Sequence, residues 1–149
     1  MAHTFANLLT HIIFSTRDRQ PLISRHLKPD LLAYMGGIVR EMQGKCVAAN
    51  SMPDHVHMLI WLPPGLPIAD AVRVVKTNSS RWTHRKPGRN GFAWQTGYGA
   101  FSVSQSNAAS VVKYIREQEE HHQRVTFQEE FISFLKKNGV QYNERYIWE

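Results

Sequence analysis

Two histidines stand one residue apart in a run that is otherwise largely apolar. The run MPDHVHMLIW covers residues 52–61 and contains His55 and His57. Side chains alternate across a β-strand, so both imidazoles would lie on one face of a strand, opposite Val56 and Met58. Two imidazoles on one face can bind the same metal ion, and a tight site would need a third ligand from elsewhere in the chain. The alternative is a pair of ordinary strand histidines, each satisfied by hydrogen bonds.

A polar segment later in the chain provides candidates for the third ligand and for a nucleophile. Residues 113–124 (KYIREQEEHHQR) contain almost no apolar side chain except Ile115, so this segment is poorly suited to packing in a core. In a helix, Tyr114 and Gln118 are about one turn apart on the same face, and His121 continues the stripe. An amide oxygen can complete a metal site, and a tyrosine beside the metal can act as a nucleophile. The alternative is a half-buried tyrosine on a solvated helix.

The balance of charge favours a polyanionic partner. Eighteen Lys and Arg residues face twelve Asp and Glu residues, which gives a formal net charge of +6. A group of basic side chains lies near two tryptophans, where cations can bind phosphates and aromatic rings can stack on unpaired bases. The alternative is a solvated helix face, and Trp82 is expected in the core. The residues predicted to contact DNA are Lys76, Arg81, Arg85, Lys86, Arg89 and Trp94.

The elements that position these residues can be predicted from apolar periodicity and turn signals. Strands are expected at residues 5–16, 46–51, 55–62 and 98–104, and helices at 29–43, from about 67 through 82, at 107–124 and at 127–138. The order β-α-β-β-α-β followed by two helices is typical of an α+β, ferredoxin-like (RRM-like) fold. We expect an antiparallel sheet with helices on one face and the other face free to bind, although this fold alone indicates no function.

Length and cysteine content bound the remaining possibilities. The 149 residues are expected to form one domain, with a core at 5–105, a tyrosine-bearing helix at 107–124 and a C-terminal helix at 127–138. The single cysteine, Cys46, excludes an intramolecular disulfide and favours a reducing, cytoplasmic setting. No apolar run approaches the roughly 20 residues of a membrane helix, and the N-terminus lacks the pattern of a signal peptide. We therefore expect no membrane association.

Taken together, the motifs resemble the single-tyrosine HUH transposases of insertion sequences, with REP-associated tyrosine transposases as relatives. HUH denotes His, hydrophobe, His, which His55-Val56-His57 satisfies. The resemblance covers most of the chain, through HIIFSTRDR, MPDHVHMLI, VKTNSS, WQTGY and YIREQ, which begin at residues 11, 52, 75, 94 and 114. The segment 99–104 departs from the family, because its residues are smaller than expected after Tyr98, and this puts the DNA-facing surface there in doubt.

The resemblance implies a site and a reaction. His55, His57 and Gln118 would bind a divalent metal, Mg²⁺ or Mn²⁺, and Tyr114 would be the nucleophile. The tyrosine would attack single-stranded DNA at hairpin-containing element ends or repeats, forming a 5′-phosphotyrosine and freeing a 3′-hydroxyl. A homodimer is also implied, in which the tyrosine helix of one chain often completes the histidine pair of the other.

Two other functions are compatible with parts of the pattern. A non-catalytic module that binds single-stranded nucleic acid would explain the charge and the fold, and would leave His55, His57, Tyr114 and Gln118 as coincidences. A metal hydrolase acting on a small molecule would predict a closed apolar pocket, which the basic loop after the second helix disfavours.

Overall fold

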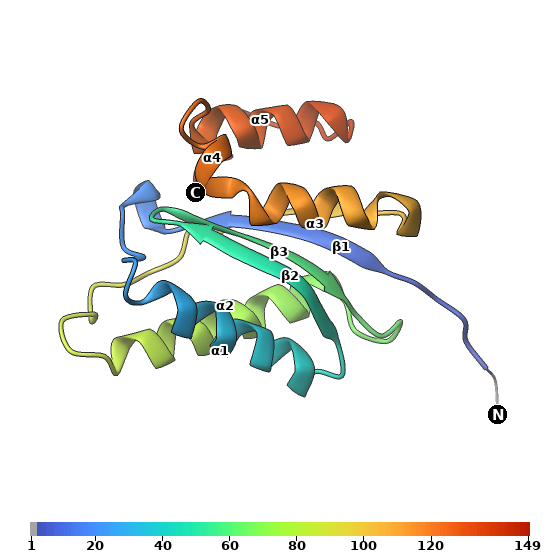
Figure 1. The fold of residues 1–149 in the computed structure, drawn as a ribbon, viewed down its shortest axis with the longest axis horizontal. Coiled ribbons are helices and arrows are strands. Elements are labelled where there is room, and N and C mark those ends of the chain that lie inside the picture. Colours follow the sequence, from blue (N-terminus) through green and yellow to red (C-terminus); the bar gives the residue numbers. More distant parts are fainter. Residues whose placement is uncertain (1–2) are drawn as a thin grey trace.

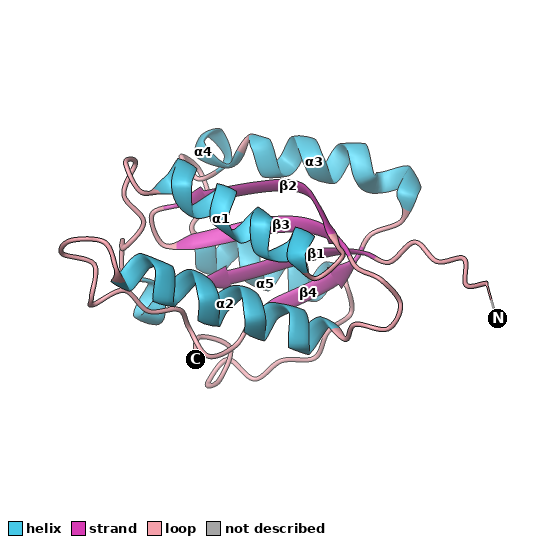
Figure 2. Cartoon of the chain, turned by 90° about the horizontal axis from the view of Figure 1, so that it is seen from below, coloured by secondary structure: helices cyan, strands magenta, loops and turns pink. Residues whose placement is uncertain are grey.

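The computed structural model describes residues 3–149 and has three layers, with a sheet between two sets of helices (Figures 1 and 2). The sheet is antiparallel with the order β2-β3-β1-β4. Its strands are β1 (Leu9–Ser15), β2 (Lys45–Met52), β3 (His55–Trp61) and β4 (Gly99–Ser102). The helices α1 (Lys28–Glu41) and α2 (Ile68–His84) cover one face, and α3 (Ala108–Arg116), α4 (Gln118–His121) and α5 (Phe127–Lys137) cover the other.

The α+β, ferredoxin-like arrangement predicted from the sequence is confirmed by this strand order. The expectation that the second face of the sheet is free is wrong, because α3, α4 and α5 fold back over it. None of the helices in residues 3–149 is long and apolar enough to cross a membrane.

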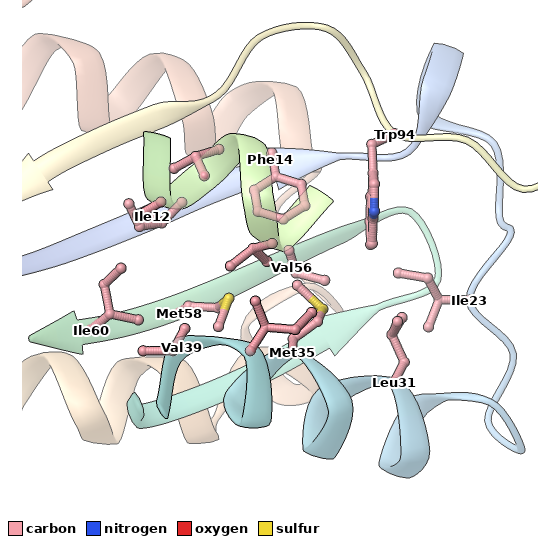
Figure 3. Packing of buried hydrophobic residues seen from close by; sticks show 14 of the residues in the cluster. Ile12, Phe14, Ile23, Leu31, Met35, Val39, Val56, Met58, Ile60 and Trp94 are labelled. Atoms are coloured by element: carbon pink, nitrogen blue, oxygen red, sulfur yellow. The ribbon is translucent and has the colours of Figure 1, made fainter. Parts of the chain in front are cut away.

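The larger core lies between the sheet and the helices α1 and α2 (Figure 3). Alternation along β1 and β3 directs Phe14, Val56 and Met58 to this side, where they meet Met35 of α1 and are each at most 1% exposed. Trp94 closes the same core, with its ring edge-on to Phe14 at 4.8 Å between centroids. The strand pattern thus fixes which face of β3 is apolar, and so which face carries the histidines.

Two smaller apolar clusters lie on the opposite face of the sheet. One joins Leu59 of β3 to Ile115 of α3, and the other joins Ile13 of β1 to aromatic side chains of α5, including Phe131. The strand histidines lie between these clusters. Helix packing on both sides therefore positions the polar groups of this face and limits the access of water to them.

The tyrosine-bearing segment is two helices and not the single helix predicted at 107–124. Helix α3 ends at Arg116, and Glu117 leaves the helical conformation with φ −95° and ψ 23° before α4 begins. The Asn50 side chain on β2 donates hydrogen bonds from Nδ2 to the carbonyl oxygens of Ile115 (2.8 Å) and Arg116 (3.3 Å). These carbonyls at the helix end are satisfied by the sheet, which stabilises the break and anchors α3 to β2.

Candidate active site

The two histidines of β3 point to the same side of the sheet, as strand alternation predicted. Both are nearly fully buried, with exposed fractions of 1% for His55 and 0% for His57. The Nε2 atom of His57 lies 2.8 Å from Oε1 of Glu130, and the Nε2 atom of His55 lies 3.5 Å from the same oxygen. His122 adds a third imidazole, with its Nε2 atom 3.1 Å from Nε2 of His55.

These four side chains form a group that can hold a metal ion. One ligand atom from each of His55, His57, His122 and Glu130 lies within 4.8 Å of the others. Three imidazoles and one carboxylate suit transition metals such as zinc better than they suit magnesium, which prefers oxygen ligands. A divalent cation would also compensate the buried Glu130 carboxylate. The donor set therefore fits a divalent metal, as the sequence led us to expect, and includes two residues that the sequence did not indicate as ligands, His122 and Glu130.

Gln118, the predicted third ligand, is buried at the start of α4. Its Nε2 atom donates to the carbonyl oxygen of Tyr114 at 3.2 Å, and its Oε1 atom has no hydrogen-bond partner within residues 3–149. Leaving a buried acceptor unsatisfied costs about 1–3 kcal/mol. A bound cation would satisfy such an oxygen, so the metal-binding role of Gln118 stays a prediction that its surroundings allow.

Tyr114, the predicted nucleophile, lies beside the histidine pair. Its ring centroid is 5.9 Å from that of His57, and its hydroxyl donates to Oε2 of Glu130 and lies 3.0 Å from Nε2 of His121. Burial, followed by the hydrogen bond to Glu130, raises the pKa of Tyr114 well above its usual value of about 10. The tyrosine is therefore held neutral, with its proton directed at a carboxylate.

Glu130 connects the nucleophile to the histidines. It is 2% exposed and comes from α5, a helix to which the sequence assigned no chemical role. Burial alone would raise its pKa, but hydrogen bonds from His122 and His57 hold the pKa well below its usual range. Glu130 is therefore an ionised carboxylate whose two oxygens reach two different functional groups.

The buried histidines give the metal-free protein a pH-dependent stability. Burial lowers the pKa of His57 from 6.5 to about 4 and that of His11 to about 3. Between pH 6.5 and 4 the unfolded chain binds protons that the folded chain does not. The contribution of these two histidines to stability is therefore full above pH 6.5 and falls as the pH drops. The pKa of His122 is raised, so its contribution to the free energy of unfolding changes above pH 6.5. It therefore does not offset the loss of stability between pH 6.5 and 4.

We expect the free energy of unfolding to fall by on the order of 3 kcal/mol between pH 6.5 and 4 from His57 alone, at about 1.4 kcal/mol per pKa unit. Urea unfolding of the metal-free protein at several pH values measures this. The exposed-histidine variant His26→Gln is the control. A free energy that stays level over this pH range would contradict the burial of neutral histidines.

Two of the predicted DNA contacts are corrected by the structure. Trp94 is 7% exposed and donates from Nε1 to Oγ of Ser79 at 3.0 Å, so its ring is not available to stack on a base. The Nζ atom of Lys76 donates to the carbonyl oxygens of Gln95 (3.0 Å) and Thr96 (3.3 Å). Lys76 therefore holds the loop before β4 against α2 and is not a free cation for phosphate.

The other four predicted DNA contacts lie at or after the end of α2. Arg81, Arg85 and Lys86 are exposed, and Arg89 donates from one guanidinium nitrogen to Oγ of Ser24 at 2.8 Å. That bond joins the loop after α2 to the loop before α1. Their contact with DNA stays a prediction, and Trp82 is partly buried against the core, as expected.

The fold first places the chain among transposases. A solved Deinococcus radiodurans R1 protein assigned as a transposase matches with a TM-score of 0.63 and 26% identity, over 79% of this chain and 95% of that one. A REP-associated tyrosine transposase bound to a REP hairpin matches with a TM-score of 0.61 and 17% identity, over 84% of this chain and 74% of that one. At 17% identity the second likeness shows the fold alone.

The sequence then defines the family. Residues 4–118 match the family model of IS200-like transposases, and the chain belongs to this family. The transposase of insertion sequence element IS200 from Salmonella typhimurium is 25% identical over 124 residues, which are 79% of this chain and 81% of that protein. The ISDra2 transposase TnpA of Deinococcus radiodurans is 25% identical over 114 residues, 72% of this chain and 81% of that protein. The resemblance inferred from the motifs is confirmed.

His121, His122 and Glu130 lie beyond the family match, which ends at Gln118. Sequence reasoning placed His121 on the tyrosine stripe, with a solvated helix as the alternative, and it gave His122 and Glu130 no role. The one available signal was the pair of adjacent histidines in a segment with few apolar residues.

Proposed function

We propose that this transposase cuts and rejoins single-stranded DNA through a covalent 5′-phosphotyrosine at Tyr114. One observation carries the proposal. The two oxygens of Glu130 contact the hydroxyl of Tyr114 and Nε2 of His57, so the nucleophile lies next to the nitrogens that can bind a metal. In a non-catalytic binding module, a tyrosine and a metal-binding pair would have no reason to meet at one buried carboxylate.

The reaction balances without an external energy source. The Oη atom of Tyr114 gives its proton to His121 and bonds to the scissile phosphorus. The bond from phosphorus to the 3′ oxygen breaks, and that oxygen takes up a proton from solvent to leave a 3′-hydroxyl. A second 3′-hydroxyl later attacks the same phosphorus, and the tyrosine leaves with its proton restored. A divalent ion held by His55, His57 and their partners would supply Lewis-acid stabilisation of the charge on the phosphate.

Glu130 and His121 assist the tyrosine in different ways. Glu130 is buried and orients the hydroxyl, whereas His121 is partly exposed and can exchange a proton with solvent. A tyrosine whose pKa is raised needs such an acceptor before it can attack. When the phosphate of the DNA arrives, the negative charge of Glu130 must move away from it or be compensated by the cation.

Of the two ions that the resemblance implies, Mg²⁺ and Mn²⁺, we propose Mn²⁺, because three of the four candidate donors are imidazoles and magnesium prefers oxygen ligands. Removing metal with EDTA is expected to abolish cleavage, and Mn²⁺ is expected to restore it at a lower concentration than Mg²⁺ does. A cleavage assay on a single-stranded oligonucleotide with a terminal hairpin measures both. Recovery with Zn²⁺ alone would contradict this choice of metal.

We also propose that each active site is complete within one chain. Tyr114 and His57 of the same chain are neighbours, and the bonds from Asn50 to the end of α3 anchor the tyrosine helix to its own sheet. The predicted homodimer stays a prediction, and it would not need to exchange this helix.

A mixture of His57→Ala and Tyr114→Phe chains is therefore expected to form no more adduct than either chain alone. The chains are mixed, denatured together and refolded, so that exchange between partners is possible. Chains of the unsubstituted protein carried through the same refolding are the positive control. Recovery of adduct in the mixture would show that the tyrosine of one chain serves the histidines of another.

The exposed arginines and Lys86 at the end of α2 are proposed to bind the DNA backbone. Arg81, Arg85 and Lys86 are exposed at the end of α2 and in the loop after it, and Ser24 lies in the loop before α1. The bond from Arg89 to Ser24 joins these two loops into one surface. Contacts of this kind bind phosphates without reading sequence, so they would position a strand and leave the choice of cleavage site to other residues.

A further inference from the structure

His11 of β1 is a buried histidine outside the metal-binding group. It is 2% exposed, and its Nε2 atom lies 2.8 Å from Nδ1 of His57. In the strand register His11 lies opposite Leu59 and Ile13 lies opposite His57, so the two histidines are diagonal neighbours on one face of the sheet. The contact therefore follows directly from the pairing of β1 with β3.

The surroundings of His11 are mostly apolar or aromatic. The ring of Phe134 meets it edge-on at 5.1 Å between centroids, and the ring of Tyr114 lies at 6.4 Å. An imidazole buried here loses its hydration, and the bond to His57 is what compensates it. A leucine or phenylalanine would pack at this place without that cost, so filling space does not explain the residue.

The partner histidine, His55, has an equivalent contact. Its Nδ1 atom lies 2.6 Å from Oδ1 of Asp54, while its Nε2 atom faces His122 and Glu130. In both imidazoles of β3, Nδ1 thus contacts a residue outside the four candidate metal ligands, and Nε2 faces the other candidate ligands. A second group on the far nitrogen of a metal-binding histidine sets its tautomer and ring orientation.

The tautomers of His11 and His57 are coupled through this bond. In the structure Nε2 of His57 faces an oxygen of the ionised Glu130, which only accepts, so His57 carries its proton on Nε2 and accepts at Nδ1 from His11. A cation can bind Nε2 only after that proton has left. His57 then carries its proton on Nδ1 and needs an acceptor there.

We propose that His11 is a positioning residue that reverses its hydrogen bond when a metal binds, accepting at Nε2 from the Nδ1–H group of His57. Each ring stays neutral and keeps one proton, which moves from Nε2 to Nδ1 in both. His11 thereby holds the ring of His57 in the orientation for binding. The inference rests on the metal site of the proposed function and adds a residue to it that touches neither the metal nor the DNA.

The test compares two substitutions at this position. His11→Phe keeps the bulk and removes the acceptor, whereas His11→Gln places an amide oxygen near the position of Nε2. Zn²⁺ is used as a diamagnetic probe, with affinity measured by calorimetry. Long-range proton–nitrogen spectra of ¹⁵N-labelled protein report which nitrogen of His57 carries the proton, and His57→Gln assigns its signals. Thermal unfolding of each metal-free chain shows that it folds.

For the unsubstituted protein we expect His57 to change from Nε2–H to Nδ1–H when Zn²⁺ binds. His11→Phe is expected to weaken Zn²⁺ binding by about 10–100-fold, which is the usual cost of losing such a partner. His11→Gln is expected to restore most of the affinity. In cleavage assays, His11→Phe should raise the Mn²⁺ concentration needed for half-maximal rate more than it lowers the rate at saturating Mn²⁺.

Unchanged Zn²⁺ affinity in His11→Phe, an Nε2–H proton on His57 in the Zn²⁺-bound protein, or no Zn²⁺ binding by the unsubstituted protein would each overturn the inference. The proposed function fails by a different observation, the absence of a Tyr114–DNA adduct. If Zn²⁺ binding depends on His11 and no adduct forms, the positioning role stands and the DNA chemistry does not.

Discussion

A Tyr114→Phe chain is expected to form no covalent adduct with single-stranded DNA and to lose at least about 1000-fold in cleavage rate, as when an enzyme loses its nucleophile. The substitution removes only the hydroxyl that donates to Glu130 and approaches His121, and it keeps the aromatic packing against Phe134. The chain should therefore fold and still bind DNA. Denaturing gels with the substrate labelled at either end measure the loss.

The position of the label distinguishes the chemistry. In a 5′-phosphotyrosine the protein retains the DNA on the 3′ side of the cut, so a 3′ label should enter the adduct and a 5′ label should appear in a free strand. Tyr146→Phe is the matched control, because Tyr146 is 53% exposed, and it should behave as the unsubstituted protein does. An adduct that persists in Tyr114→Phe would remove Tyr114 from the mechanism.

His57→Ala has the second large expected effect, the loss of both metal binding and adduct formation. His57 is the residue whose Nε2 atom meets Glu130 and whose Nδ1 atom meets His11, so its removal takes away a ligand and leaves two buried partners unsatisfied. We expect the affinity for Mn²⁺ to fall by more than the roughly 100-fold that losing an outer partner can cost. Calorimetry and the adduct assay measure the two losses separately.

DNA affinity gives this experiment its control. The exposed basic residues at the end of α2 are far from His57 in the sequence and are unchanged in the variant, so binding to an uncleaved oligonucleotide should persist. His26→Ala, at an exposed histidine before α1, should retain both metal binding and cleavage. Normal cleavage by His57→Ala at ordinary Mn²⁺ concentrations would show that β3 does not hold the catalytic ion.

Much of the fold could be predicted because its signals are local. Strand alternation placed His55 and His57 on one face opposite Val56 and Met58, and the turn at Pro53-Asp54 gave the β2–β3 hairpin. The helix cap at Thr126 also follows from its neighbours, since its side chain accepts from the backbone N–H of Glu129. Each of these depends on residues only a few positions apart.

The composition of the site could not be predicted, because it depends on contacts between distant segments. Glu130 meets His57 across 73 positions in the chain, and nothing in the spacing of either indicates the other. The low apolar content of residues 113–124 made a solvated helix a plausible alternative, yet Gln118 within this segment is fully buried. Polar side chains on this face are buried against other polar side chains, which a hydrophobic pattern cannot report.

The two corrected DNA contacts have the same origin. Trp94 and Lys76 are adjacent to basic, aromatic sequence and are suited by type to bind a nucleic acid. In the structure, Trp94 packs against Phe14 in the core. Lys76 donates to three carbonyl oxygens of the loop before β4, including that of Gly97. Residue type alone does not distinguish a side chain that binds a ligand from one that makes stabilising contacts within the protein.

The break after α3 shows how a long-range contact changes a local prediction. Residues 107–124 contain neither glycine nor proline, and a continuous helix was the natural expectation. Asn50 of β2 binds the last carbonyls of α3, and α4 then turns His121 and His122 toward Glu130. A single straight helix would not bring both histidines to that carboxylate.

The measurement that tests the central claim most directly is a mass-spectrometric map of the protein–DNA adduct. The protein is incubated with a single-stranded hairpin substrate and Mn²⁺, the bound DNA is trimmed with nuclease, and the digested peptides are analysed. The predicted result is a nucleotide joined through its 5′ phosphate to the peptide that contains Tyr114. An adduct on any other residue, or bound DNA with no adduct in Mn²⁺ or Mg²⁺, would contradict the account.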